Sequence, residues 1–114
     1  MIWPFAPFDR RRGREVDLLE VPPTLMDGAV FYRAVTAEEG RRQIDAHVDA
    51  VKAAGGAVVF DWHLEQLNPG RLRGAGAALA GGLRALAGDS DAHWTTAIEA
   101  ARWWRERRER IRSG

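Results

Sequence analysis

The sequence contains no cysteine among its 114 residues. Disulfides and thiolate metal sites are therefore excluded, although the missing cysteines say little about the cellular compartment. Long apolar runs are also missing, since no run approaches the roughly 18–20 residues that a membrane-spanning helix needs. Neither charge is in large excess, because the formal net charge is +1. With no overall field to attract them, we expect no nucleic acid and no membrane as partners.

A signal peptide is missing too. Residues 1–8 have neither a basic leader nor a long apolar stretch, so we expect a cytoplasmic protein. The chain instead begins at once with apolar and aromatic side chains, which is typical of a start within a fold. Apolar residues make up 46% and charged residues 29%, as in ordinary globular domains. The length suits one domain with a modest core.

Two capping boxes mark the starts of two helices. Thr36 is followed by Glu39 and Thr96 by Glu99, so each threonine hydroxyl can accept a hydrogen bond from the glutamate amide. We predict helices over about residues 36–54 and 96–112, with Gly55 as the C-cap of the first. The buried stripe of the first helix is predicted to be Ala37, Gly40, Ile44, Val48 and Val51. The inward face of the second is predicted to be Ala97, Ala100, Ala101, Trp103, Trp104 and Ile111.

A third helical pattern lies between these two. Its apolar stripe is Leu72, Ala75, Leu79, Leu83 and Leu86. Four glycines interrupt it, at positions 74, 76, 81 and 82, and each costs a helix roughly 0.8–1 kcal/mol relative to alanine. Packing must therefore hold this helix together, and the glycines allow a close approach to a sheet or a partner.

Arginines cluster twice. Arg10–Arg14 is interrupted only by Gly13 and reads as a polar loop, either solvated or in contact with a phosphate or acidic sugar. Residues 105–110 interleave four arginines with two glutamates, and Glu106 and Arg110 have a favourable i,i+4 spacing. A solvated helix face explains the second cluster better than nucleic-acid binding, because the glutamates would repel phosphate.

The chain is organised around residues 55–70. A short apolar run at 57–60 lies between turn signals and predicts a strand buried on both faces, as in a parallel sheet. Polar residues follow abruptly, beginning with Asp61 and His63. Catalytic residues of α/β folds lie at the carboxyl ends of such strands, so His63 is the candidate catalytic residue. Asp61 shares its side of the strand and could orient the ring or raise its basicity, or both residues merely cap the strand end.

Further strands are predicted at residues 16–21 and 92–95. Between the first of these and the helix at 36, the segment around Asp27 is irregular and mostly buried. Asp27 is there either for turn chemistry or for a role at a site. Alternation of strands and helices implies an α/β fold with a small parallel sheet. We expect a single, partial domain over residues 1–114, with an irregular segment at 1–15 and an α/β core at 16–112.

Three segments carry a resemblance to a known family. Residues 19–31, Leu19-Glu20-Val21-Pro22-Pro23-Thr24-Leu25-Met26-Asp27-Gly28-Ala29-Val30-Phe31, resemble the "elP…mD.tLf" segment of polysaccharide deacetylase-like proteins (carbohydrate esterase family 4 and its relatives). Residues 56–63, ending in Asp61-Trp62-His63, are similar to that family's "GGv.vllWH". Residues 94–104 are similar to its final "w.t..eia.ww". The likeness covers most of residues 16–110.

The resemblance implies the C-terminal part of a distorted (β/α)₇ barrel that removes acetyl groups from sugars with a divalent metal. It implies that His63 is the general acid toward the leaving amine, and that Asp27, Asp61 and Trp62 line a carbohydrate cleft. The family's metal ligands, an aspartate and a His-x-x-x-His pair in the N-terminal half, have no counterpart here. His47, His63 and His93 fit no compact metal motif. We therefore expect no metal site in this chain, and zinc or another divalent metal only with a companion half.

Two hypotheses follow. The first is a C-terminal fragment or remnant of such a hydrolase, inactive alone, which binds carbohydrate and is completed by a companion N-terminal half. The alternative is a small non-catalytic α/β module that forms a homodimer or completes a partner through its glycine-rich helix and an open sheet edge. Which sugar or acyl group is involved, and whether Met1 is the biological start, are left open.

Overall fold

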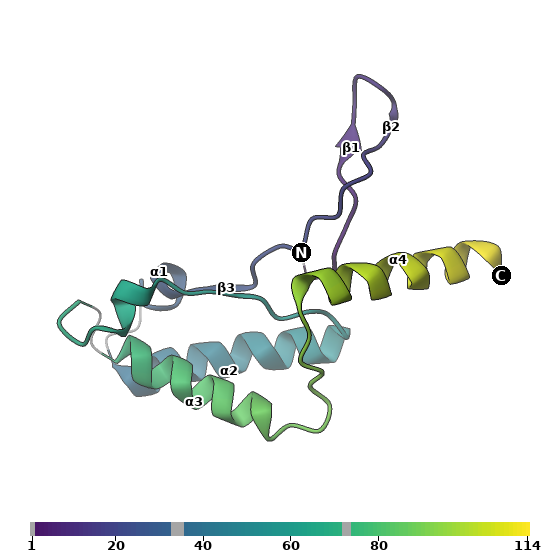
Figure 1. Ribbon diagram of the computed structural model, residues 1–114. Coiled ribbons are helices and arrows are strands. Elements are labelled where there is room, and N and C mark those ends of the chain that lie inside the picture. Colours follow the sequence, from purple (N-terminus) through teal and green to yellow (C-terminus); the bar gives the residue numbers. More distant parts are fainter. Residues whose placement is uncertain (1, 33–35, 72–73) are drawn as a thin grey trace. The chain divides into compact units, whose positions relative to one another are not determined.

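The chain divides into two compact units, each described separately below. In the computed structural model, residues 2–32, 36–71 and 74–114 are described (Figure 1). The first unit, which we call the core unit, contains Ile2 and Pro23–Ala92. The second, which we call the hairpin unit, contains Trp3–Pro22 and His93–Gly114. The described residues form four α-helices and two two-stranded sheets, one of them parallel, so the expected α/β class is confirmed.

The core unit is built on two short parallel strands. β3 (Leu25–Met26) pairs with β4 (Phe60–Asp61), with Leu25 opposite Phe60 and Met26 opposite Asp61. The Thr24 side chain extends this pairing, because its hydroxyl donates to the Ala57 carbonyl at 3.0 Å and accepts from the Val59 amide at 3.2 Å. A parallel pair needs a helical crossover, and α1 (Asp27–Val30) and α2 (Ala37–Ala54) provide it.

The start and end of α2 agree with the sequence signals. Thr36 accepts from the Glu39 amide, the Glu39 side chain accepts from the Thr36 amide, and Gly55 closes the helix with a left-handed φ of 66°. The buried residues of α2 are Gly40, Ile44, Val48 and Val51, which confirms all of the predicted stripe except half-buried Ala37.

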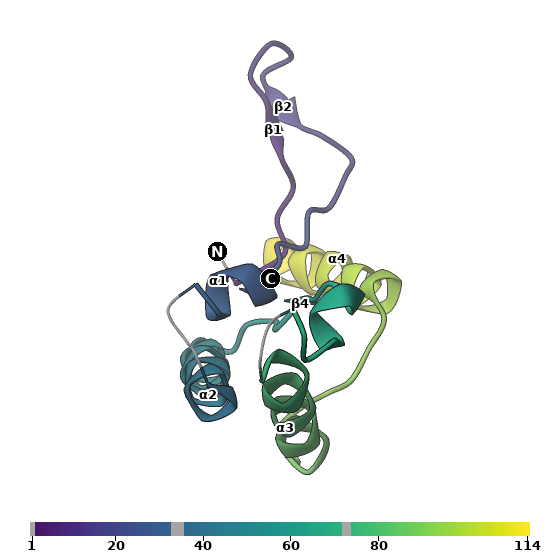
Figure 2. The ribbon, with the colours of Figure 1, turned by 90° about the vertical axis from the view of Figure 1, so that its left-hand side faces the viewer.

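α3 (Ala75–Ala87) follows β4 and the short 3₁₀-helix η1 (Leu64–Leu67). It lies beside α2 (Figures 1 and 2). Two of its glycines face α2: a Cβ at Gly82 would come within 2.9 Å of the Ile44 side chain, and one at Gly81 within 2.8 Å of Arg41. The predicted close approach is therefore made within the chain itself. Leu72 of the predicted stripe lies outside the described residues.

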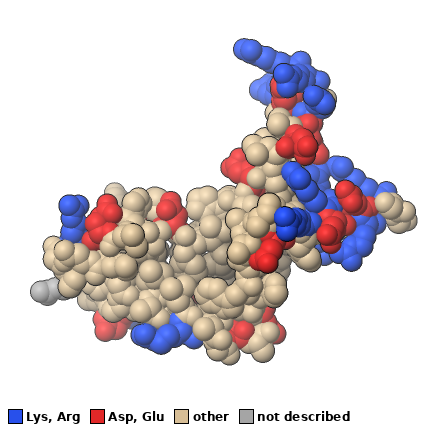
Figure 3. Space-filling model, in the orientation of Figure 1, with Lys and Arg blue, Asp and Glu red and all other residues tan. Residues whose placement is uncertain are grey.

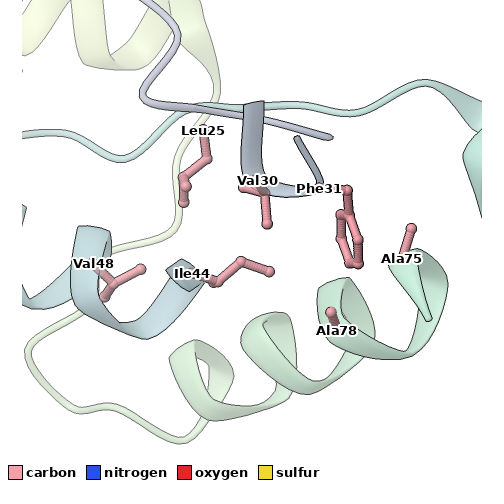
Figure 4. Packing of buried hydrophobic residues seen from close by; sticks show 7 residues of the cluster. All are labelled: Leu25, Val30, Phe31, Ile44, Val48, Ala75 and Ala78. Atoms are coloured by element: carbon pink, nitrogen blue, oxygen red, sulfur yellow. The ribbon is translucent and has the colours of Figure 1, made fainter. Parts of the chain in front are cut away.

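The hydrophobic core lies between the strands β3 and β4 and the helices α1, α2 and α3 (Figure 4). Ile44 is its most completely buried side chain. Partly buried side chains from the β4 region, including Phe60 and Trp62, pack against it. The buried members of this core are Leu25, Val30, Phe31, Ile44, Val48, Ala75 and Ala78. All eight buried hydrophobic residues of the described chain, these seven and Val51, belong to the core unit.

The hairpin unit departs from expectation at its amino end. We expected no regular element in residues 1–15, but β1 (Phe8–Asp9) and β2 (Arg14–Glu15) form an antiparallel hairpin. Turn chemistry explains the difference. Asp9 Oδ1 accepts from the Arg11 and Arg12 amides, and Gly13 adopts a φ of 63° that favours glycine.

The remaining element of this unit is α4 (Ala97–Ser113), which begins at the predicted Thr96–Glu99 capping box. The Trp104 ring of α4 stacks on Trp3 at a centroid distance of 5.1 Å. Ala97, Trp103 and Ile111 of its predicted inward face are exposed, whereas Ala100, Ala101 and Trp104 are half-buried.

Two predicted strands are not formed. At residues 16–21 the structure has only an isolated bridge, Phe5 to Glu20, and at 92–95 it has none. The Trp94 side chain there is exposed. Each helix of the described chain is too short or too polar to cross a membrane.

Candidate active site

His63 and Asp27 lie at the same end of the parallel strands. Asp27 directly follows β3, and His63 comes two residues after β4. Because the two strands are parallel and in register, both residues leave the sheet at its carboxyl end. This is where α/β folds place reactive side chains. Two residues 36 positions apart in the sequence are thus brought together by one strand pairing.

The Asp27 carboxylate holds His63 by both its ring and its backbone. Oδ1 lies 3.0 Å from His63 Nδ1, and Oδ2 accepts from the His63 backbone amide at 2.8 Å. Oδ1 also accepts from the Gly28 amide at 2.6 Å. Asp27 is only 2% exposed, and three N–H groups surround its two oxygens. The carboxylate is therefore fixed in position before any ligand arrives.

The hydrogen bonds decide the charge state of the carboxylate. Burial by itself would raise the pKa of Asp27, but the hydrogen bonds from the His63 amide, the His63 ring and the Gly28 amide outweigh burial and lower that pKa below its ordinary value. Asp27 is thus an anion at neutral pH. An ionised carboxylate only accepts hydrogen bonds, so Nδ1 of His63 must be the donor.

The same pairing changes the basicity of the imidazole. The hydrogen bond from Nδ1 to Asp27, followed by the Coulomb attraction of that carboxylate, raises the pKa of His63 above its ordinary value. The charges of Asp61 and Glu65 add to this. The His63 side chain is 51% exposed. Its Nε2 atom makes no hydrogen bond to any residue in the described parts of the chain, so this nitrogen is available to exchange a proton with a ligand.

The other predicted site residues have different surroundings. Asp61 is exposed and affects His63 only through its charge, so Asp27 and not Asp61 orients the ring. Trp62 directly follows β4 and is half-buried. It packs against the hydrophobic core and meets Phe31 edge to face at 6.2 Å.

The two remaining histidines are separate from this pair. His47 is exposed on α2 and bonds the Gln43 carbonyl through Nδ1 at 2.8 Å. His93 is exposed in the hairpin unit.

The sequence indicated both members of the pair but not their contact. The apolar surroundings of Asp27 were the available signal, since a buried carboxylate requires a partner. Asp61 is close to His63 in sequence and its charge adds to the raised pKa of the ring, but the carboxylate that orients the ring is that of Asp27. A pairing across 36 positions depends on the register of β3 and β4, which no local pattern specifies.

The side chains present do not fit a divalent metal. Within the described residues, no three His, Asp or Glu side chains gather in a way that could hold a metal ion, whereas such a site needs about three protein ligands. No family model, curated protein or solved structure matches this chain. The chemistry of the site therefore rests on the Asp27–His63 geometry.

Proposed function

We propose that this chain supplies the proton-transferring part of a polysaccharide deacetylase-like hydrolase that acts on acetylated sugars. It would form the C-terminal part of the distorted barrel that the sequence resemblance implies. The observation that carries the proposal is the Asp27–His63 pair: a buried carboxylate oriented by three N–H groups, bonded to a half-exposed imidazole at the carboxyl end of parallel strands.

His63 acts in this proposal as general acid. With Nδ1–H bound to Asp27, the Nε2–H of the protonated ring donates its proton to the sugar nitrogen as the bond between that nitrogen and the acyl carbon breaks. The raised pKa of His63 keeps more of the ring protonated near neutral pH. Asp27 stabilises the imidazolium and holds its orientation. The metal that the resemblance implies finds no ligand set among the described residues, so no step is assigned to it.

The sheet itself supports an incomplete site. Parallel sheets are normally covered on both faces and contain more strands, but within the described chain β3 and β4 pair only with each other. Met26 of β3 is also left 42% exposed. These open edges suit a companion N-terminal half. They equally favour the second candidate, a non-catalytic module that dimerises or completes another protein.

The test is carbohydrate binding followed at the histidine rings by NMR. Addition of an N-acetylated chito-oligosaccharide should shift the His63 ring signals in a saturable manner, with no acetate released by this chain alone. His63→Gln should abolish binding, whereas His47→Gln, an exposed histidine outside the pair, should leave it unchanged.

Two results would count against the proposal. Unshifted His63 signals at high oligosaccharide concentration would remove the carbohydrate assignment. If sedimentation then showed a tight dimer, the second candidate would take its place. Acetate release by the purified chain would show that a companion half is unnecessary.

A further inference from the structure

The arginine cluster near the amino terminus forms the tip of the β1–β2 hairpin. Residues 10–13 connect the two strands, and Arg14 begins β2. All four arginines, Arg10, Arg11, Arg12 and Arg14, are exposed, and we call them the arginine tip. Figure 3 shows this concentration of basic side chains at the end of the hairpin. The net charge of the whole chain, +1, does not reveal this concentration. The hairpin unit alone has ten arginines and seven acidic residues.

Neighbouring acidic residues do not neutralise the tip. Asp9 is held by the tip amides and pairs with Arg12 at 3.6 Å. Two further acidic side chains of this segment pair with α4: Glu15 with Arg108 at 2.9 Å, and Asp17 with Arg105 at 3.3 Å. Glu20 lies at the bridge to Phe5, at the opposite end of the hairpin from the tip.

Three guanidinium groups are left uncompensated. Arg10, Arg11 and Arg14 make no ion pair with any residue in the part of the chain that the structure describes. The positive charge of the arginine tip is therefore directed outward, toward whatever approaches the end of the hairpin.

We propose that the arginine tip binds the phosphate backbone of double-stranded DNA. Guanidinium groups bind phosphate oxygens through paired N–H donors, and the unpaired arginines are presented together at the end of one hairpin. A two-stranded β-ribbon fits the roughly 12 Å wide major groove of B-form DNA. The contacts are to phosphates, so binding is independent of base sequence.

The order of side chains along the hairpin favours DNA over an anionic membrane. Phe8 and Leu18 are 60% and 58% exposed, but they lie on the stem and the arginines lie at the tip. Contact with a bilayer requires apolar side chains to enter more deeply than the charged ones. In this hairpin the arginines lie at the tip, ahead of the apolar side chains, which suits a groove lined by phosphates. This surface belongs to the hairpin unit, and its role is independent of the Asp27–His63 pair.

Binding of the full chain to a 20-base-pair DNA duplex, measured by fluorescence anisotropy at several salt concentrations, tests this inference. The triple variant Arg10→Ala/Arg11→Ala/Arg14→Ala should weaken binding at least tenfold at low salt. It should also reduce the slope of log K against log salt by about 2–3, since each phosphate contact contributes about 0.9. The control Arg42→Ala/Arg71→Ala/Arg84→Ala removes the same charge from exposed positions of the core unit and should change binding less than threefold.

Equal weakening by both triple variants would overturn the inference, because binding would then depend on net charge and not on the tip. Absence of duplex binding at 20 mM salt would overturn it too. So would binding to vesicles of phosphatidylcholine and phosphatidylglycerol without binding to the duplex, which would assign the tip to a membrane surface.

Discussion

Asp27 is the one charged side chain in the described chain that is buried. It connects three features: the end of β3, the first turn of α1 and the ring of His63. Burial of an ion is costly unless its hydrogen-bonding capacity is used, and the donors from Gly28 and His63 meet that need. Held by these three donors, the carboxylate in turn orients the exposed imidazole and raises its pKa.

Replacing Asp27 by asparagine should lower the pKa of His63. The change removes the hydrogen bond to an anion and its Coulomb attraction, the two largest causes of the raised pKa. A pH titration of the His63 ring signals by NMR measures it. Asp61→Asn is the matched control: it removes a charge that acts only at a distance, so its effect should be smaller. Equal shifts in the two variants would contradict the assignment of Asp27 as the partner.

The same variant should lose stability in a pH-dependent manner. The raised pKa of His63 contributes stability below about pH 6.5, and this is lost as pH rises through the folded-state value. The lowered pKa of Asp27 contributes above about pH 3.9 and is lost as pH falls through its folded-state value. The difference in unfolding free energy between wild type and Asp27→Asn should therefore be largest between about pH 4 and 6.5, at about 1–3 kcal/mol for a broken buried hydrogen-bond set. Urea unfolding across this range measures it, and a difference that does not vary with pH would contradict the ionised pair.

The packing of α3 on α2 depends on glycine at particular positions. A methyl group at Gly82 would lie 2.9 Å from the Ile44 side chain, which is fully buried, while one at Gly76 would meet Leu67 at an ordinary 3.5 Å. Gly82→Ala should therefore destabilise the protein by about 1–3 kcal/mol through overpacking. Gly76→Ala should instead stabilise it by up to about 1 kcal/mol through helix propensity. Thermal or urea unfolding of both variants measures this contrast, and stabilisation by Gly82→Ala would show that the helices can separate at no cost.

Elements with local signals were predictable, and elements that depend on distant partners were not. Thr36 and Glu39 specify the start of α2, and Thr96 and Glu99 that of α4, because the capping box is complete within four residues. Residues 92–95 have strand-forming side chains but no neighbouring strand, so composition alone was misleading. The β1–β2 hairpin was not predicted, because residues 10–14 have the composition of a polar loop. The Asp9 turn and the left-handed Gly13 are the features that join the two strands.

For the candidate site, the sequence predicted the histidine but not its partner. His63 followed from a buried strand with an abrupt polar end, which is a local pattern. Its contact with Asp27 depends on which strand lies beside β4, and periodicity along one strand says nothing of that choice.

The two units of the chain are stabilised in different ways. The core unit has a continuous buried cluster, whereas the hairpin unit relies on aromatic stacking of Trp3 with Trp104 and on ion pairs such as Glu15 with Arg108. Exposed ion pairs contribute little. The guanidinium of Arg107 also lies 5.9 Å from the Trp3 ring centre, so Trp3 meets α4 at two of its side chains, Trp104 and Arg107.

Trp3→Ala should therefore loosen the hairpin unit alone. Hydrogen exchange of the α4 amides should become about tenfold faster, since a stacked aromatic pair contributes roughly 0.5–1.5 kcal/mol beyond its buried area. Exchange of the α2 amides should not change. Trp94→Ala, at an exposed ring, serves as control and should affect neither helix. If α2 and α4 lost protection together, the two units would open as one.

The contact between Asp27 and His63, which lie 36 positions apart in the sequence, also couples folding to proton uptake. The ring acquires its raised pKa only when β3 and β4 have paired, and pairing must first close the long loop between them. Near pH 7 the unfolded ring is mostly neutral, while the folded ring binds more protons. Refolding in an unbuffered solution should therefore draw protons from the solvent, and the time at which the pH rises marks the moment when the two strands meet.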